Sequence, residues 1–375
     1  MTSLAAQDSL PSISDEPARA RAASRDIGID TMRGFAILMV IGIHSLPQPR
    51  DLGIDTMRGL AILMVIGIHS LQHPLSSWQT AVDAVLRPCV PIFLFVSGYL
   101  TALSGKVPLM RRLTTAVIPY AIAFVAAYVY MALHNPAMDH RPTTTLARFV
   151  LAYAFVYYYV FVYIGCTICL WLVFAAASAR PQFHIRLVTL LLLAIVIGLT
   201  FGSYLDPLLA RFGAGDSLVE EIRMRDIPFW FAFMALGALG GVFRIRYVLP
   251  DTRALLIGAA CLTYVIYAAV RLFQLGDAAD YDSIAFFGYA ALLCSLLLAI
   301  GAELPLIASL GSGSYFIYLW HIFFVMLMRD HAPLHQLGPA TGSLITFAVA
   351  TAGSIVALMT VRELAPHRIC RWLGA

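Results

Sequence analysis

The sequence predicts an all-α, polytopic integral membrane protein with about ten transmembrane helices in one bundle. Three observations lead to this fold class. The 375-residue chain is 60% hydrophobic and only 12% charged, whereas soluble domains carry roughly 25% charged residues. Its apolar runs are long and continuous, and only helices or closed barrels satisfy the backbone within lipid. The runs lack the alternation of barrel strands, so helices are expected.

Windows of about 20 apolar residues mark the predicted spans. In chain order they cover residues 54–73, 84–104, 113–133, 155–178, 185–204, 226–243, 253–273, 283–301, 312–328 and 341–361. Residues 146–154 are also apolar and are expected to form a short interfacial helix. Basic residues favour alternate loops, as in the cluster Lys106, Arg111 and Arg112. This bias places both termini in the cytoplasm.

One segment near the N-terminus occurs twice. Residues 25–46 and 50–71 differ only at Ile27/Leu52 and Phe35/Leu60, with a period of 25 residues. Nothing else repeats, so this is a local tandem duplication. The apolar run of the first copy has 12 residues and ends at Pro47, which is short for a span, and proline stops a helix. We expect the first copy to lie at the interface or to be disordered, and the second to form the first span.

Three domains follow from this division. Residues 1–53 are a cytoplasmic tail plus the non-core copy, residues 54–362 the ten-helix membrane domain, and residues 363–375 a cytoplasmic C-terminal tail. Residues 1–24 have no apolar core, so they are not interpreted as a signal peptide but as a disordered tail. Cys166-x-x-Cys169 lacks a second pair or nearby histidines, so no metal site is predicted.

Arg58 and His69 are the ionisable residues that frame the first span, with ten residues between them. At ~1.5 Å per residue they lie roughly 16 Å apart along a helix, so His69 is near the membrane centre if Arg58 is at one face. An ionisable group at that depth is a functional-site candidate; a buried histidine bonded to a neighbouring helix is the alternative. Asp55 lies one turn before Arg58 and can pair with it, so Arg58 is either a topological anchor or a ligand-binding cation.

Four motifs occur in order along the chain. They are Asp55-x-x-Arg58-Gly59-x-Ala61 with His69, VPIFLFVSGYL at 90–100, RRLTTAVIPY at 111–120, and LGSGSYFIYLWH at 310–321. Together, in a chain with ten predicted spans, they resemble the acyltransferase 3 family of membrane-bound acyltransferases that modify surface polysaccharides. The resemblance covers about 54–362. Thr115 is a departure, because the family often has another arginine there. The first copy matches with Arg33 and His44, but the spacing to Phe93 favours the second.

The resemblance implies an O-acyltransferase of the bacterial inner membrane. An acyl group, most often acetyl, would pass from cytoplasmic acetyl-CoA to a sugar hydroxyl of an exopolysaccharide, another surface glycan or its lipid-linked precursor. No permanently bound cofactor is expected. The expected partners are acetyl-CoA, the polysaccharide or lipid-linked oligosaccharide acceptor, the lipid bilayer and other glycan-assembly proteins, and not nucleic acid. His69 could be the general base or could carry the acyl group itself, with Arg58 and Asp55 in support.

The other candidate residues are assigned to the donor or to a cavity. Lys106, Arg111 and Arg112 could hold the donor's phosphates, although positive-inside bias alone would also explain them. His321 is expected roughly 13 Å into its helix, near the depth of His69, so that both histidines would suit a shared cavity. Ser97 with Gly98 also suits close helix contact. The remaining cavity or acceptor candidates are Tyr315, Trp320, Ser97 and Tyr99.

A transporter or flippase for a glycan intermediate is the competing interpretation, because buried ionisable groups in a helix bundle suit it as well. The sequence shows no repeated half and no pair of matching broken helices. Both features are typical of transporters, so the acyltransferase interpretation is preferred.

Overall fold

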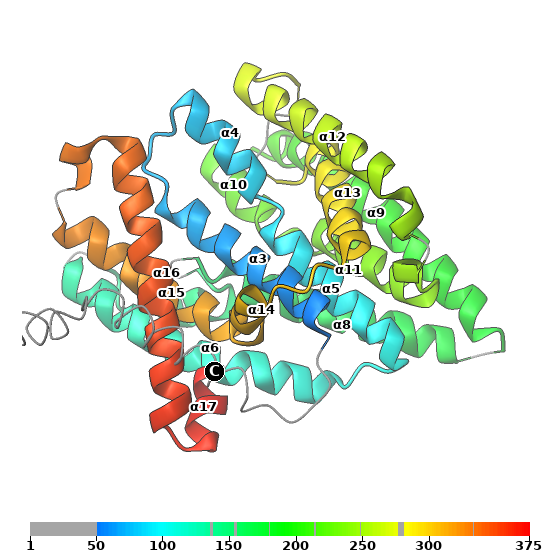
Figure 1. Cartoon of the computed structure of the whole chain (residues 1–375), viewed down its shortest axis with the longest axis horizontal. Coiled ribbons are helices and arrows are strands. Elements are labelled where there is room, and N and C mark those ends of the chain that lie inside the picture. Colours follow the sequence, from blue (N-terminus) through cyan, green and yellow to red (C-terminus); the bar gives the residue numbers. More distant parts are fainter. Residues whose placement is uncertain are drawn as a thin grey trace, which may run out of the picture. The chain divides into compact units, whose positions relative to one another are not determined.

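The computed structural model describes residues 51–135, 138–153, 156–179, 181–213, 215–247, 249–276, 281–332 and 334–375. Contacts divide the chain after Pro49, and the unit from Arg50 onward is described by itself. The first copy of the duplicated segment, with Arg33 and His44, lies outside the described residues. The described part consists of helices without strands (Figure 1), which confirms the predicted all-α class.

The helices, in chain order, are α3 (Leu52–Ser70), α4 (Ser77–Leu86), α5 (Cys89–Ser104), α6 (Leu109–His134), α7 (Pro142–Val150), α8 (Tyr158–Ser178), α9 (Phe183–Arg211), α10 (Asp216–Arg223), α11 (Ile227–Val242), α12 (Arg253–Phe273), α13 (Ile284–Ile300), α14 (Pro305–Ser312), α15 (Ser314–His331), α16 (Pro339–Leu364) and α17 (His367–Leu373). Three short 3₁₀ turns, η1 (Ile245–Tyr247), η2 (Leu249–Thr252) and η3 (Leu334–Leu337), join some of them.

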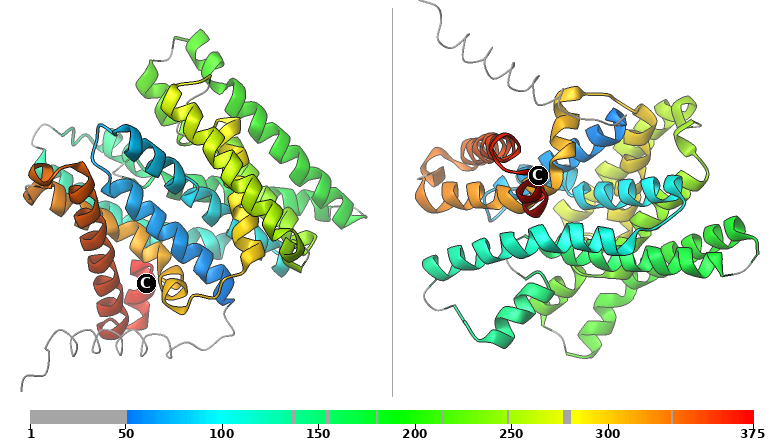
Figure 2. Two further views of the ribbon diagram at one scale, coloured as in Figure 1. Left: turned by 45° about the horizontal axis from the view of Figure 1, so that its top comes forward. Right: turned by 90° about the horizontal axis from the view of Figure 1, so that it is seen from below.

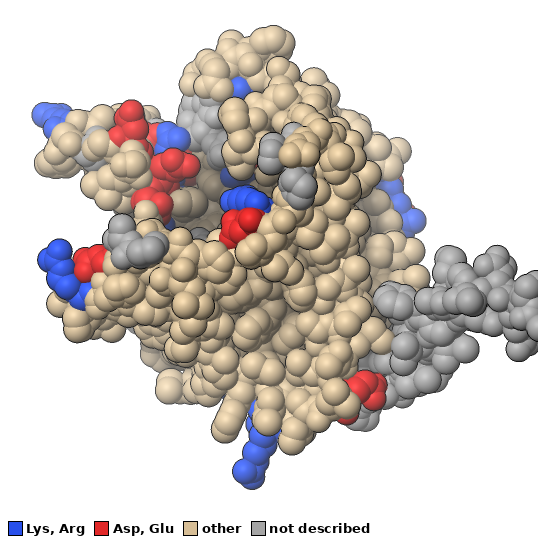
Figure 3. Space-filling view, turned by 90° about the vertical axis from the view of Figure 1, so that its left-hand side faces the viewer, with Lys and Arg blue, Asp and Glu red and all other residues tan. Residues whose placement is uncertain are grey.

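Each of the ten predicted spans coincides with a helix, and α7 overlaps the predicted interfacial segment. Within the described residues, seven helical segments are long and apolar enough to cross a membrane, or up to eight if α14 and α15 form one span. The shorter helices α11 and α13 have 16 and 17 residues. The protein is therefore a multi-pass membrane protein, and a broad area without charged side chains on one face suits contact with lipid (Figure 3).

Helix α3 lies in the middle of the bundle (Figure 1) and packs against α5, α14, α15 and α16. It begins because the Asp51 carboxylate accepts a hydrogen bond from the Ile54 amide at 3.1 Å, which satisfies an amide that the first turn leaves free. It ends at Ser70, and Leu71 is extended. Arg58 is thus inside the helix, not at its end, and His69 is its penultimate residue. The depth of His69 in the membrane depends on where the bilayer meets α3, so the expectation that it lies near the membrane centre stays a prediction.

Glycines let two pairs of helices meet backbone to backbone. A Cβ on Gly59 would overlap the Ile307 carbonyl of α14, and a Cβ on Gly311 would overlap the Asp55 carbonyl of α3. Gly98 of α5 meets the Met234 carbonyl of α11 in the same way. Small residues permit such close approach within membranes. Three of the four motifs therefore contain a glycine that fixes a helix crossing next to a candidate site residue.

A bend of 84° separates α14 from α15, and the sequence analysis did not predict it. Pro305 begins α14, and Gly313 joins the two helices. The span predicted at 312–328 starts instead at Ser314, after a separate helix. The span predicted at 84–104 lies within Ser77–Ser104, a segment long and apolar enough to cross a membrane, although Arg87 and Pro88 divide this segment into α4 and α5. Proline has no amide hydrogen and disrupts the preceding turn, which explains the second break.

Most of the C-terminal residues form a short helix, α17. Helix α17 packs against α6 and α16, as Figures 1 and 2 show. Cys370 is buried, and its thiol lies 3.4 Å from the Val361 carbonyl oxygen and 3.3 Å from that of Ala365. This contact brings Gly374 next to the ring of Tyr315, at the edge of the site described below.

Candidate active site

Three arginines from two helices line one cavity of about 430 Å³. We call it the arginine cavity. Arg58 comes from α3, and Arg111 and Arg112 come from the first turns of α6. The full lining consists of Arg58, Phe93, Ser97, Pro108, Arg111, Arg112, Thr115, Ala116, Tyr159, Tyr163, Ser314, Tyr315 and Tyr318. Among the described residues, this lining includes no Asp or Glu, so the cavity is strongly cationic.

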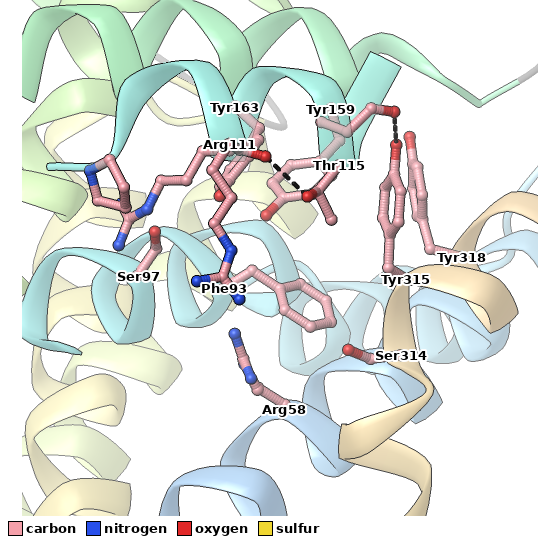
Figure 4. A pocket seen from close by; sticks show the side chains of 13 residues that line it. Arg58, Phe93, Ser97, Arg111, Thr115, Tyr159, Tyr163, Ser314, Tyr315 and Tyr318 are labelled. Carbon is pink, nitrogen blue, oxygen red and sulfur yellow. Dashed lines mark hydrogen bonds between the residues drawn. The ribbon is translucent and has the colours of Figure 1, made fainter. Parts of the chain in front are cut away.

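The two arginines of α6 are held differently. The Arg112 Nη2 atom donates a hydrogen bond to the Thr101 hydroxyl of α5 at 2.6 Å, while its Nη1 atom is buried with no hydrogen-bond partner. Arg111 points across the cavity toward Arg58 (Figure 4). Two guanidinium groups that face each other repel, and an unpaired buried donor is costly. Both observations indicate a site shaped for an anion between them.

Arg58 is oriented by its own helix. Its Nη1 atom lies 3.7 Å from the Asp55 carboxylate one turn earlier, and its side chain is 37% exposed. Asp55 itself does not line the cavity; its backbone carbonyl is the atom against which Gly311 packs. A partly exposed ion pair at this distance is weak. Arg58 therefore retains most of its ability to bind an anion in the cavity, while Asp55 positions it.

His69 and His321 lie side by side on α3 and α15, with ring centroids 5.5 Å apart. His321 is fully buried. Its Nδ1 atom lies 3.1 Å from the Ile317 carbonyl oxygen and 2.8 Å from that of Tyr318. Only a protonated Nδ1 can donate to these carbonyls, so the neutral ring keeps a lone pair on Nε2. That Nε2 atom is buried without a partner, which makes it an acceptor available to a neighbouring imidazole.

His69 lines a second cavity of about 370 Å³, which we call the histidine cavity. It is lined by His69, Ser70, Leu71, Gln72, His73, Val325, Met328, Arg329, Ala332, Leu334 and Thr346. His321 does not reach this lining, and none of these residues also lines the arginine cavity. The two predicted histidines are therefore adjacent, but they do not share a cavity as the sequence suggested.

The structure brings some of the remaining predicted residues together and leaves others apart. Ser97 and Tyr315 line the arginine cavity, and the Tyr315 hydroxyl donates to the Ala116 carbonyl at 2.6 Å. Lys106 is exposed and outside the lining. Tyr99 is buried in a separate apolar cluster. Trp320 stacks on Phe323 with a centroid distance of 5.4 Å and lines neither cavity.

Several lining residues were not site candidates in the sequence analysis: Phe93, Thr115, Tyr159, Tyr163 and Ser314. Tyr159 and Tyr163 lie four residues apart on α8, which puts them on one helix face. That spacing was a usable signal, although α8 carries no motif to draw attention to it. Ser314 and Tyr318 were inside a recognised motif, but only the bend before α15 turns them toward Arg58.

The comparison with protein families identifies the class of protein. The model of the acyltransferase domain matches residues 51–359, which is most of the chain. The protein is a multi-pass membrane acyltransferase, and the chain belongs to the acyltransferase 3 family. The match begins in the second copy of the duplicated segment and does not include the first. Searches of curated proteins and of solved structures found no match.

Proposed function

We propose that this protein is an O-acetyltransferase of the bacterial inner membrane that uses acetyl-CoA as its donor. The acceptor is a sugar hydroxyl of an exopolysaccharide, another surface glycan or its lipid-linked precursor. Family membership supports acyl transfer. One observation carries the rest of the proposal: a single helix, α3, presents an arginine to a cationic cavity and a histidine to a separate cavity.

The arginine cavity is the proposed donor site. Coenzyme A carries several phosphates, and planar guanidinium groups bind phosphate oxygens in pairs. Arg58, Arg111 and Arg112 provide three such groups within one cavity, and the buried Nη1 atom of Arg112 has a donor left to use. Placing this end of the bundle on the cytoplasmic side agrees with the excess of basic residues in the loops there.

The histidine cavity is the proposed acceptor site. His69 can accept the proton of the sugar hydroxyl, because imidazole exchanges protons near neutral pH. The hydroxyl oxygen then attacks the thioester carbonyl carbon, and the carbon–sulfur bond breaks. His321 is assigned as a positioning residue. Its ring lies next to that of His69, and its Nε2 atom, which is buried without a hydrogen-bond partner, can accept an N–H of the His69 imidazole. The other nitrogen of His69 then acts as the base.

The test is the O-acetyl content of the host's surface and exported glycans, measured by NMR. A deletion strain is complemented with wild type, His69→Ala or His44→Ala at matched protein levels. We expect the acetyl signal to vanish on deletion and to return with wild type and His44→Ala only. His44 is the matched control, since it occupies the same position in the other copy. An unchanged acetyl signal combined with altered glycan export would replace this proposal with the transporter interpretation.

A further inference from the structure

A row of neighbouring aromatic rings leads from the lining of the arginine cavity to His69. Phe93 and Tyr159 have ring centroids 5.8 Å apart, Tyr159 and Tyr318 5.4 Å, and Tyr318 and His321 6.3 Å. His321 in turn lies 5.5 Å from His69. Phe93, Tyr159 and Tyr318 line the arginine cavity, whereas His69 lines the histidine cavity. The row therefore connects the proposed donor site with the proposed base.

Two of the three rings that face the arginine cavity are fixed in place. Tyr318 is 5% exposed, and its hydroxyl donates to the Val156 carbonyl at 2.6 Å. Tyr159 is 9% exposed and meets the Tyr318 ring edge-on. Phe93 is only partly buried and has no polar group through which it could be anchored. It is the ring of the row that can shift most easily when a ligand enters.

We infer that Phe93, backed by Tyr159 and Tyr318, forms the wall that restricts the transferred acyl group to a short chain. This inference rests on the proposed function. With the phosphates held by the three arginines, the thioester must extend toward His69, so its acyl group meets this row of rings. A two-carbon group can pass where Phe93 gives way, whereas a longer chain has to displace the two fixed tyrosines. Phe93 is thus the specificity-determining residue.

The same wall explains how hydrolysis is avoided. During transfer the acceptor oxygen bonds to the acyl carbon, the carbon–sulfur bond breaks, and the hydroxyl proton passes through His69 to the departing thiolate. Water that reached the thioester could take the place of the sugar hydroxyl. Rings packed next to the reacting atoms leave less room there for water. Restricting acyl length and excluding water are consequences of the same packing.

The experiment uses the full chain in inverted membrane vesicles of the deletion strain, which supply the native acceptor. Vesicles with wild type or variant protein receive acetyl-, butyryl- or hexanoyl-CoA labelled in the acyl group, and label incorporated into glycan is counted. Wild type should prefer acetyl over hexanoyl. In Phe93→Ala the hexanoyl-to-acetyl ratio should rise about tenfold or more, because losing six ring carbons makes room for several methylenes, and each methylene in an apolar pocket changes selectivity about tenfold or more.

Two further variants guard against misreading this result. Phe93→Met keeps a similar volume and should keep the wild-type ratio, so that it reports correct folding. Phe323→Ala removes a ring of α15 that lines neither cavity and should leave the ratio unchanged.

A Phe93→Ala ratio within twofold of wild type would overturn the inference, as would a wild type that uses hexanoyl-CoA as well as acetyl-CoA. Both outcomes leave the proposed function intact. Label that never enters glycan even with wild type overturns the proposed function and this inference together.

Discussion

The arginine cavity and the histidine pair differ in how far their side chains are shielded from solvent. The arginine cavity gathers three cations from α3 and α6, of which Arg58 is 37% exposed while the Nη1 atom of Arg112 is buried. The histidine pair buries His321 completely and places its ring against His69. Binding a polyanion requires charges that stay hydrated until the ligand arrives, whereas moving a proton benefits from oriented groups shielded from water. Arg58 and His69 lie at different cavities along α3, and this separation suits both proposed roles.

His69→Ala should have the largest effect and tests the proton-transfer half of the comparison. A positioned general base contributes about 10²–10⁴ in rate, so kcat should fall by about that factor. The KM for acetyl-CoA should stay within about twofold, because the arginine cavity is intact. Initial rates of thiol release from acetyl-CoA in the vesicles would show this. A raised KM with normal kcat would mean that His69 belongs to donor binding.

Arg58→Ala should give the converse pattern. Losing hydrogen bonds from a charged donor costs about 1.5–3 kcal/mol, so the KM for acetyl-CoA should rise about 10- to 100-fold with a smaller change in kcat. Arg58→Lys should recover only part of the loss, because an ammonium cannot bind phosphate oxygens as a fork. The same vesicle assay, run over a range of donor concentrations, provides both constants. An unchanged KM would mean that Arg58 does not bind the donor and acts only as a topological anchor.

His321→Leu should lower kcat by about tenfold, less than loss of His69, since it acts through that residue. His321→Gln retains an acceptor oxygen and should recover most of the rate. A positioning role predicts that the acid limb of the pH–rate profile shifts in the Leu variant and stays in place in the Gln variant. If both variants lose the same activity and share the wild-type profile, His321 serves packing only.

Lys106→Ala should have the smallest effect. The lysine is exposed and outside the arginine cavity, so both kcat and KM should stay within about twofold of wild type, as for most exposed substitutions. This variant tests whether the donor's phosphates are bound by the arginine cavity or attracted by the positive charge of the loop as a whole. A tenfold rise in the KM for acetyl-CoA would show that the loop charge as a whole, and not the cavity, attracts the donor.

The sequence predicted the helices well because each depends on its own composition. All ten apolar segments became helices, and the glycine beside Ser97 was correctly linked to a close helix contact. The similar depths estimated for His69 and His321 also agree with their adjacent rings. The sequence did not predict three other features: the bend before α15, the separation of the two cavities, and the contribution of α8 through Tyr159 and Tyr163.

By itself, the sequence determined the class and the chemistry that is on offer. Long apolar runs leave a chain no alternative to helices in lipid, and Arg58 and His69 place ionisable groups near the two ends of one such run. The tertiary structure alone decided how these groups face one another. Backbone contacts at Gly59 and Gly311 set the crossing of α14 on α3, and α15, which follows the 84° bend, carries Tyr318 at the arginine cavity and His321 beside His69. Such arrangements depend on packing between residues far apart in the chain, which no local pattern encodes.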